Sequence, residues 1–264
     1  MKRDGHIHTP FCPHGTKDSL QSYIEKAIRS GFSDISFTEH APLPASFLDP
    51  TPLKDSGMRY TEVHPYIDAI KQAKDAYKND IRIRIGFEVD FIAGFEHETT
   101  AFLDEVGPML DDAILSVHFL KVGGAYHCMD YSKEVFLNLA AIAGSAAAVY
   151  DLYYETVEAS IASDLGRFKP KRIGHPTLVH KFQLAHNETI DDSRQIERIF
   201  NKIQKAGYEI DLNSAGFSKP ECLESYPPER FIVLANTLGI PLVFGSDAHS
   251  AKGLHNHYDK LYNK

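Results

Sequence analysis

Two histidines stand two positions apart near the start of the chain, as His6-Ile7-His8. Side chains at positions i and i+2 point the same way only when the backbone is extended, so a first strand is predicted to end in two parallel imidazole rings. A third histidine, His14, lies on the loop that would follow. Imidazole is a common metal ligand. The chain holds 14 histidines, however, so one such pair can arise by chance.

The other predicted strands carry metal-binding residue types at the same place. Short apolar runs predict these strands at 35–38, 81–89, 113–117, 172–174, 208–212 and 241–244. At or just past their ends stand His40, Glu88, His118, His175, Asp247 and His249, and the strand at 208–212 is followed by Asn213. Six of the seven strands therefore end in His, Glu or Asp. Such recurrence is far less expected by chance than a single histidine pair.

The combination of many imidazoles with few carboxylates suits Zn²⁺, Fe²⁺ or Mn²⁺, whereas Ca²⁺ prefers oxygen ligands. Nine candidate ligands are too many for a single four-coordinate ion, so they predict two or three ions. Glu88 is the natural bridge, because a carboxylate can bind two ions at once. A cluster of this kind generates hydroxide at neutral pH and holds a phosphoryl group for in-line displacement.

The strands alternate with helical patterns. Helices are predicted from Leu20 to Gly31, after an N-terminal cap at Thr61, at 95–106, at 133–165 with a break near Gly144, after an N-terminal cap at Thr189, and at 227–238. Strand–helix repetition implies parallel strands with right-handed crossovers. We therefore predict one α/β domain over 1–264, a (β/α)7 TIM-like barrel with its active groups at the carboxyl ends of the strands. The long proline-containing loop at 41–60 is a candidate wall or lid.

Composition limits the classes of partner. The formal net charge is −8, so nucleic-acid binding through a broad basic face is not expected. The sequence shows neither the apolar run of a signal peptide nor a stretch of ~18 apolar residues that would span a membrane. Three cysteines without Cys-x-x-Cys spacing indicate a reducing compartment, so we expect a soluble, cytoplasmic protein. Oligomeric state leaves no sign in the sequence.

Taken together, the motifs resemble the polymerase-and-histidinol-phosphatase (PHP) superfamily over nearly the whole chain. They are His6-x-His8, His14, Thr38-Glu39-His40, Glu88, His118, Gly174-His175 and Ser246-Asp247-Ala248-His249. Further stretches are similar to the stand-alone histidinol-phosphate phosphatases of that superfamily: Glu88–Phe91, Asp112–Leu120, Asn213–Gly216, Lys219-Pro220, Tyr226-Pro227 and Gly239–Pro241. The chain departs from the family pattern at Ser218, where an arginine often precedes the Lys-Pro pair.

The resemblance implies a distorted (β/α)7 barrel with a trinuclear centre. One ion would take His6, His8, Glu88 and Asp247; a second would take His14, His40 and His249; a third would take Glu88, His118 and His175. It also implies hydrolysis of L-histidinol phosphate in histidine biosynthesis, with a metal-bridging hydroxide attacking phosphorus. Asp247 or His249 would protonate the leaving alkoxide.

Other residues are expected to have supporting roles. Arg59, Asn213 and Lys219 are the candidate substrate contacts, and Lys181 is a weaker one. Cys12 could bind a metal, but the ligand set is complete without it. Glu39 is expected to orient a ligand. The remaining histidines are interpreted as helix, loop or tail residues: His64, His97, His127, His180, His186, His255 and His257.

Two alternatives remain open at this stage. One is another PHP phosphoesterase that acts on a nucleotide, sugar or tyrosine phosphate. The other is a non-catalytic metal-binding module.

Overall fold

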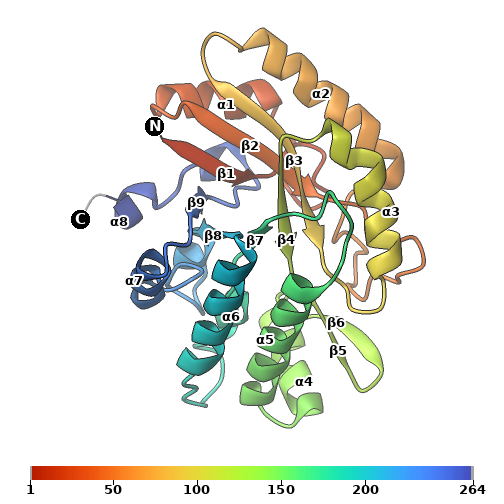
Figure 1. The fold of residues 1–264 in the computed structure, drawn as a ribbon, viewed down its shortest axis with the longest axis vertical. Helices are drawn as coiled ribbons and strands as arrows, with labels where there is room; N and C mark the ends of the chain where they lie inside the picture. The colour runs from red at the N-terminus through yellow and green to blue at the C-terminus, as the bar shows by residue number, and fades with distance from the viewer. Residues whose placement is uncertain (1, 263–264) are drawn as a thin grey trace.

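Seven parallel strands form a nearly closed ring with helices on its outside (Figure 1). The computed structural model describes residues 2–262. The strands, in their order around the ring, are β1 (Arg3–Ile7), β2 (Asp34–His40), β3 (Arg82–Asp90), β4 (Asp112–Ser116), β7 (Arg172–Ile173), β8 (Glu209–Asn213) and β9 (Leu242–Gly245). The predicted (β/α)7 barrel is therefore confirmed. Near the carboxyl ends of β1 and β9 the ring closes through two backbone hydrogen bonds, from His8 N to Ala248 O (3.1 Å) and from Asp247 N to His6 O (2.8 Å).

In residues 2–262, eight α-helices lie between or after the strands. They are α1 (Leu20–Arg29), α2 (Val63–Ala76), α3 (Glu96–Val106), α4 (Lys133–Ala143), α5 (Ala146–Ala162), α6 (Ser193–Ala206), α7 (Glu229–Thr237) and α8 (Tyr258–Tyr262). In α1 the Ser19 side chain caps the first turn, and the buried Tyr23, Ile24 and Ala27 form the face that packs on the barrel. Within residues 2–262 no single helix is long and apolar enough to cross a membrane. The pair α4 and α5 would pass on length and composition together, but it is bent by 94°.

Three local predictions need correction. Thr61 is not a helix cap, because a 3-10 turn (Tyr60–Glu62) precedes α2 and Glu62 takes the N-cap position. Thr189 is not one either, because α6 begins four residues later, after Asp192. The sequence patterns also missed the antiparallel hairpin of β5 (Phe119–Val122) and β6 (Ala125–Cys128), which directly follows His118.

The break predicted near Gly144 is confirmed. Gly144 has φ +100°, a left-handed conformation that favours glycine, and it ends α4. The next residue, Ser145, caps α5 by accepting a hydrogen bond from the backbone N–H of Ala148.

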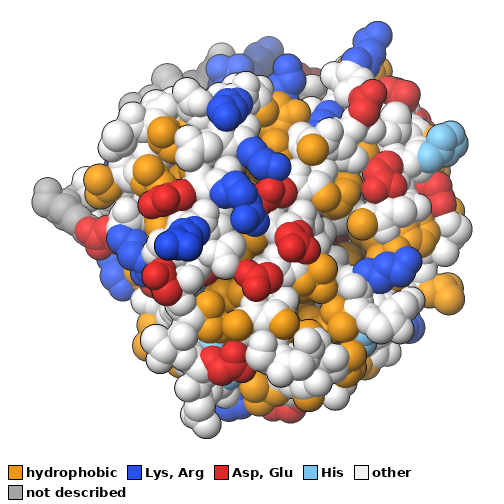
Figure 2. Space-filling view, turned by 60° about the horizontal axis from the view of Figure 1, so that its bottom comes forward, with side chains coloured by type: hydrophobic (Ala, Val, Ile, Leu, Met, Phe, Trp, Pro, Cys, Tyr) orange, Lys and Arg blue, Asp and Glu red, His pale blue; other side chains and the backbone are white. Residues whose placement is uncertain are grey.

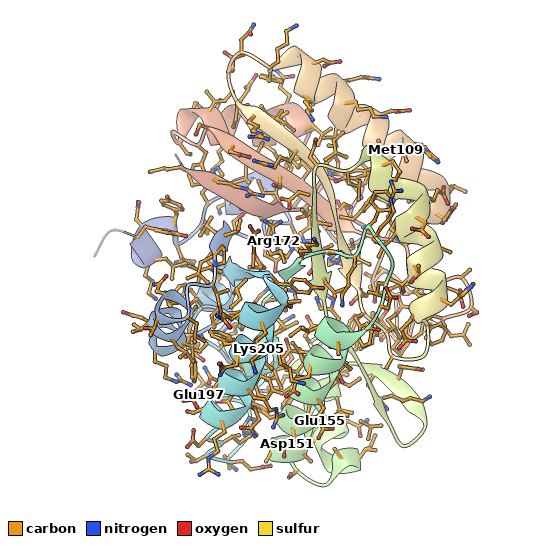
Figure 3. The ribbon with its side chains drawn as sticks, viewed as in Figure 1. Met109, Asp151, Glu155, Arg172, Glu197 and Lys205 are labelled. Atoms are coloured by element: carbon orange, nitrogen blue, oxygen red, sulfur yellow. The ribbon has the colours of Figure 1, made fainter. Side chains whose placement is uncertain are left out.

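A buried arginine fills the barrel interior at the end opposite the histidines. Arg172 is 1 % exposed and donates from Nη2 to Gly5 O (2.8 Å) and to Asp112 Oδ2 (3.0 Å). Arg3 also reaches Asp112 (2.6 Å). Burial opposes ionisation of Asp112, but the two guanidinium groups hold the pKa of its carboxyl below the usual range. Figure 3 shows Arg172, the first residue of β7, in the middle of the molecule.

We expect Arg172→Met to lower the free energy of unfolding by about 3 kcal/mol, because it removes one partner of a buried ion pair. Urea unfolding of the metal-loaded protein measures this change. The matched control is Arg29→Met on α1, where the side chain is 68 % exposed and its ion pair is worth less than about 1 kcal/mol. Equal effects of the two substitutions would show that the barrel does not depend on the buried charge.

Candidate metal centre

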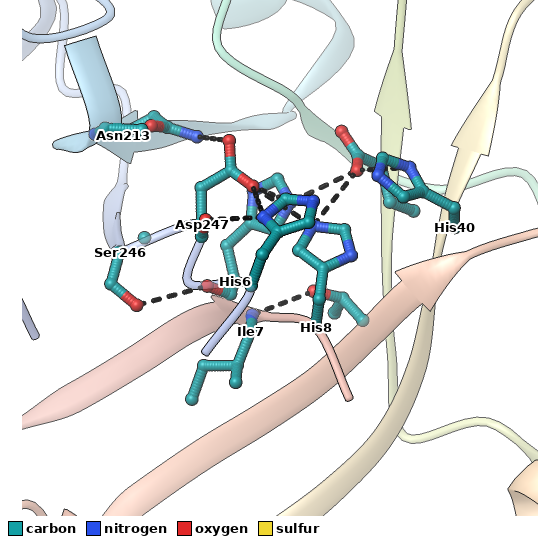
Figure 4. A network of polar contacts seen from close by, with 12 residues as sticks. His6, Ile7, His8, His40, Asn213, Ser246 and Asp247 are labelled. Atoms are coloured by element: carbon teal, nitrogen blue, oxygen red, sulfur yellow. Dashed lines mark hydrogen bonds and ion pairs between the residues drawn. The ribbon is translucent and has the colours of Figure 1, made fainter. Parts of the chain in front are cut away.

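The ligand candidates converge because parallel strands end at one mouth of the barrel. His40 and Glu88 are register partners at the ends of β2 and β3. His6 is the last residue but one of β1, and Asp247 follows β9, which lies beside β1. Figure 4 shows the side chains of His6, His8, His40 and Asp247 turned toward one another at this mouth. The nine candidate ligands predicted from the sequence all lie in this cluster: His6, His8, His14, His40, Glu88, His118, His175, Asp247 and His249.

Glu88 lies at the centre of the cluster and is 1 % exposed. Its Oε2 is 3.3 Å from His6 Nε2 and 3.1 Å from His40 Nδ1. Its Oε1 is 2.8 Å from His175 Nε2 and 3.7 Å from His118 Nε2. One carboxylate thus faces imidazoles from four strands of the barrel. This is the placement that a bridge between two ions requires.

Three subsets bring their ligand atoms within 4.8 Å of one another. They are His6, His8 and Asp247; Glu88, His118 and His175; and His8, Cys12, His40 and His249. His14 joins the third subset through its Nε2, which lies 3.1 Å from His249 Nε2. Imidazole and carboxylate donors in groups of three or four match the preferences of Zn²⁺, Fe²⁺ and Mn²⁺.

Buried atoms in the cluster lack hydrogen-bond partners within residues 2–262. They include His6 Nε2, His40 Nδ1 and Glu88 Oε2. A buried polar atom without a partner is costly, and a divalent cation would satisfy all three. The residues present therefore fit divalent metal ions.

The carboxylates hold protons on the imidazoles of His6 and His8 when no cation is present. Burial opposes protonation of His6, but Asp211, Glu88 and Asp247 together keep the pKa of His6 well above its ordinary value. In the same way, Asp247 and Glu39 raise the pKa of His8 to about 9 despite its burial. Burial disfavours the charged form of Glu88 as well, but His6 and His40 hold the pKa of its carboxyl well below the usual range. Metal ions would displace protons from these imidazoles.

Hydrogen bonds from outside the cluster orient the imidazole rings. Carboxylates contact the Nδ1 atoms of three of them: Asp211 on His6 (2.8 Å), Glu39 on His8 (3.1 Å) and Asp90 on His118 (2.7 Å). His14 Nδ1 bonds to the carbonyl of Asp55 in the 41–60 loop (2.8 Å). Such bonds fix the ring orientation and raise the basicity of the other nitrogen. Sequence reasoning anticipated Glu39 but missed Asp90 and Asp211. Asp90 stands in β3, the strand that carries Glu88, and Asp211 stands in β8, next to the strand that precedes Asp247.

Asp211→Asn is expected to weaken metal affinity by about 10–100-fold, because the His6 ring loses its charged partner. Competition with a chromophoric chelator measures the affinity directly. Asp68→Asn on α2, where the carboxylate is 66 % exposed, is the matched control. An unchanged affinity in the Asp211 variant would mean that Asp211 does not act through His6.

A cavity of about 620 Å³ opens in front of the cluster. His40, Glu88, His175, Asp247 and His249 line its inner end. Its outer wall includes Asp55, Asp130, Tyr131, Lys181 and Lys219. The cavity therefore combines the metal-binding residues with cationic and acidic groups that can contact a small charged molecule.

The candidate substrate contacts fall in three different places. Lys219 lines the cavity. Asn213 is not among the residues that line it, and it donates from Nδ2 to Oδ2 of the candidate ligand Asp247 (3.2 Å). Arg59 does not line this cavity: its side chain is 85 % exposed, and it borders a separate hollow between the 41–60 loop and α3. The cause is local, because Met58 N binds His40 O and the chain then turns outward into the 3-10 turn.

The two lysines of the cavity differ in their surroundings. Lys181 Nζ pairs with Asp130 Oδ2 (2.8 Å), and this carboxylate keeps the pKa of Lys181 above its ordinary value although burial opposes it. No carboxylate among the described residues lies within ion-pair distance of Lys219. Desolvation in the cavity wall, and then repulsion by Lys181, lower the pKa of Lys219. A lysine without a counter-ion beside a metal cluster favours an anionic ligand.

Cys12, which the sequence offers as a possible metal ligand, lies beside the cluster. The thiol is buried, and its sulfur belongs to the subset with His8, His40 and His249. Burial raises the pKa of Cys12, so it is protonated when no cation is present.

Comparison with known proteins gives consistent results. The model of the PHP domain family matches residues 4–215. The histidinol-phosphatase of Bacillus subtilis is 48% identical over 253 residues, which cover 95% of this chain and 94% of that protein. The probable histidinol-phosphatase of Deinococcus radiodurans is 30% identical, with 93% and 85% covered.

Two solved structures show the same fold. A Listeria monocytogenes protein whose histidinol-phosphatase designation is provisional aligns with a TM-score of 0.93 at 38% identity, covering 98% of this chain and 99% of that one. Histidinol phosphate phosphatase from Lactococcus lactis, solved with zinc, L-histidinol and phosphate, aligns with a TM-score of 0.70 at 19% identity, covering 99% and 93%.

Proposed function

The chain belongs to the PHP domain family, and on that premise we propose that it is a phosphoric monoester hydrolase that converts L-histidinol phosphate to L-histidinol and phosphate. One observation carries this conclusion: a histidinol-phosphatase is 48% identical over 95% of the chain. The cluster around Glu88 retains nine candidate ligands, as an active enzyme requires. A non-catalytic module has no comparable support.

The centre holds divalent metal ions, and our proposal is three per chain. His6, His8, Glu88 and Asp247 would hold one ion, and His14, His40 and His249 a second. Glu88, His118 and His175 would hold the third, with Glu88 shared. Zinc, iron and manganese all accept these donors. Bound ions supply positive charge for the phosphoryl oxygens and lower the pKa of water.

The remaining side chains of the site bind the phosphate ester and move protons. Lys219 Nζ, with Lys181 beside it, would attract the phosphate to the cavity. Burial disfavours ionisation of Asp247, but His6 and the hydrogen bond from His8 hold its pKa well below the usual range. Burial and the neighbouring His8 hold the pKa of His249 well below its ordinary value. Both groups are thus unprotonated, so either must first accept a proton before donating it to the leaving alkoxide.

The access route of the substrate, the cellular compartment and the absence of nucleic-acid binding are also part of the proposal. Its small substrate reaches the site through the open cavity. The free thiols Cys12, Cys128 and Cys222 suit a reducing compartment such as the cytoplasm. Figure 2 shows basic and acidic side chains interspersed on the face that it presents, unlike the broad basic face of a nucleic-acid-binding protein.

A panel of phosphate monoesters tests this function. The metal-loaded enzyme is expected to hydrolyse L-histidinol phosphate with a kcat/KM at least about 100-fold above the values for nucleotide, sugar and tyrosine phosphates, because the acidic wall of the cavity matches a cationic aminoalcohol. A higher kcat/KM for any of those other esters would favour the alternative PHP phosphoesterase.

A further inference from the structure

His180 lies outside the metal cluster and is 2 % exposed. It belongs to the 3-10 helix η3 (Leu178–Phe182), which follows His175 along the chain. Its Nε2 is 2.6 Å from Asp192 Oδ2, and its Nδ1 is 2.7 Å from Glu224 Oε1. Tyr154 on α5 also donates a hydrogen bond to Asp192. Both ring nitrogens therefore face carboxylates, and only the imidazolium form of histidine donates from both.

The contact of His180 with Glu224 ties together two segments that each place a lysine in the active-site cavity, and the contact with Asp192 anchors the ring from the other side. Lys181 is the next residue of η3, and Lys219 begins the 219–224 segment that ends in Glu224. Neutral hydrogen bonds also join the segments, from Leu184 N to Glu221 O (3.0 Å) and from Gln183 Nε2 to Cys222 O (2.8 Å). The contact with Glu224 adds a charged link, and buried charge-assisted hydrogen bonds are stronger than neutral ones.

A link between these segments is needed because the two lysines have the same charge. Lys181 is held by Asp130, but Lys219 has no carboxylate within ion-pair distance among the described residues. Repulsion between the ammonium groups favours separation of the segments until an anion binds between them. A fixed link on the buried side would keep both lysines facing the metal cluster before the anion arrives. Such preorganisation increases affinity by lowering the cost of ordering.

We propose that His180 is a positioning residue: as an imidazolium held between Asp192 and Glu224, it fixes Lys181 and Lys219 at the spacing that binds a phosphate group beside the metal centre. The proposal rests on the phosphatase function. Its distinct content is that a buried histidine without any contact to substrate or metal sets the affinity for phosphate.

Binding of inorganic phosphate to the metal-loaded protein, measured by calorimetry, is the main test. His180→Gln is expected to raise the Kd for phosphate and the KM for the ester about tenfold, as for the loss of one charge-assisted hydrogen bond. Values of kcat and metal content are expected to stay within a factor of about two. Gln183→Ala, which removes a neutral bond between the same segments, is the matched control and should change the Kd by less than about threefold.

A double-mutant cycle with Lys219→Ala separates positioning from a general structural effect. If His180 acts through the lysine, Lys219→Ala raises the Kd much less in the His180→Gln background than in the wild type. Additive effects, or an unchanged Kd in His180→Gln, would overturn the proposal. If the His180→Gln variant does not fold, Glu224→Gln takes its place in the cycle, because that substitution preserves the volume of the side chain and removes only its charge. Binding of inorganic phosphate is measured without turnover. It therefore tests the positioning role separately from the identity of the ester that the enzyme hydrolyses.

Discussion

Glu88→Gln is expected to lower kcat/KM for L-histidinol phosphate by at least about 1000-fold, because a bridging carboxylate supports several kcal/mol of charge stabilisation and each 1.36 kcal/mol is a factor of ten. Glu88 contacts His6 and His40 through one oxygen and His175 through the other. Glutamine keeps the shape of the side chain but removes its charge and places an amide N–H₂ against one group of rings. The histidines on both sides of Glu88, His6 and His40 at one oxygen and His118 and His175 at the other, therefore lose the anion that they share.

Metal content and steady-state kinetics of the same preparation measure the result for Glu88. We expect the bound metal per chain to fall together with kcat/KM. Glu25→Gln on the exposed side of α1 is the control and should leave both unchanged. A Glu88 variant with full metal content and undiminished turnover would remove Glu88 from the centre.

Asp247→Asn is the substitution with the second largest expected effect, a fall in kcat of about 100–1000-fold. Its Oδ1 is 3.0 Å from His8 Nε2, and its Oδ2 accepts a hydrogen bond from Asn213. The residue has φ +52°, which asparagine tolerates, so the backbone can keep its conformation. The change therefore tests the carboxylate itself, both as a ligand and as a proton acceptor.

The response of kcat to added metal separates the two roles of Asp247. If it holds metal alone, excess metal should restore most of the activity of Asp247→Asn. If it also moves the proton, activity should stay low at full metal occupancy. Asp68→Asn on α2 is the control for the loss of a surface carboxylate. Wild-type kcat in the Asp247 variant at ordinary metal concentration would contradict both roles.

The ligand positions could be predicted from the sequence because barrel geometry makes them local. Each of the candidate ligands His40, Glu88 and Asp247 stands within two residues of the end of its own strand, so a nearly correct strand end suffices to place it. The register of β2 on β3 then puts His40 beside Glu88. Division of the ligands among individual ions depends on side-chain directions, which strand ends do not determine.

Features that depend on contacts between distant segments could not be predicted in the same way. Asp211 and Asp90 are read from sequence as ordinary strand residues, and only the closed ring shows that each contacts an imidazole. Arg59 was predicted near the phosphate because of its loop, but the path of that loop depends on bonds such as Met58 N to His40 O. His180 was assigned no role because its partners Asp192 and Glu224 are 12 and 44 residues away.

The most direct test of the central claim is a metal titration of the chelator-treated protein, with turnover of L-histidinol phosphate measured at each step. We expect no turnover without metal and a rise to full activity only when more than one ion is bound per chain, since our proposal has Glu88 shared between two ions and its two oxygens face different imidazoles. Full turnover of the metal-free protein, or with a single ion per chain, would contradict the account.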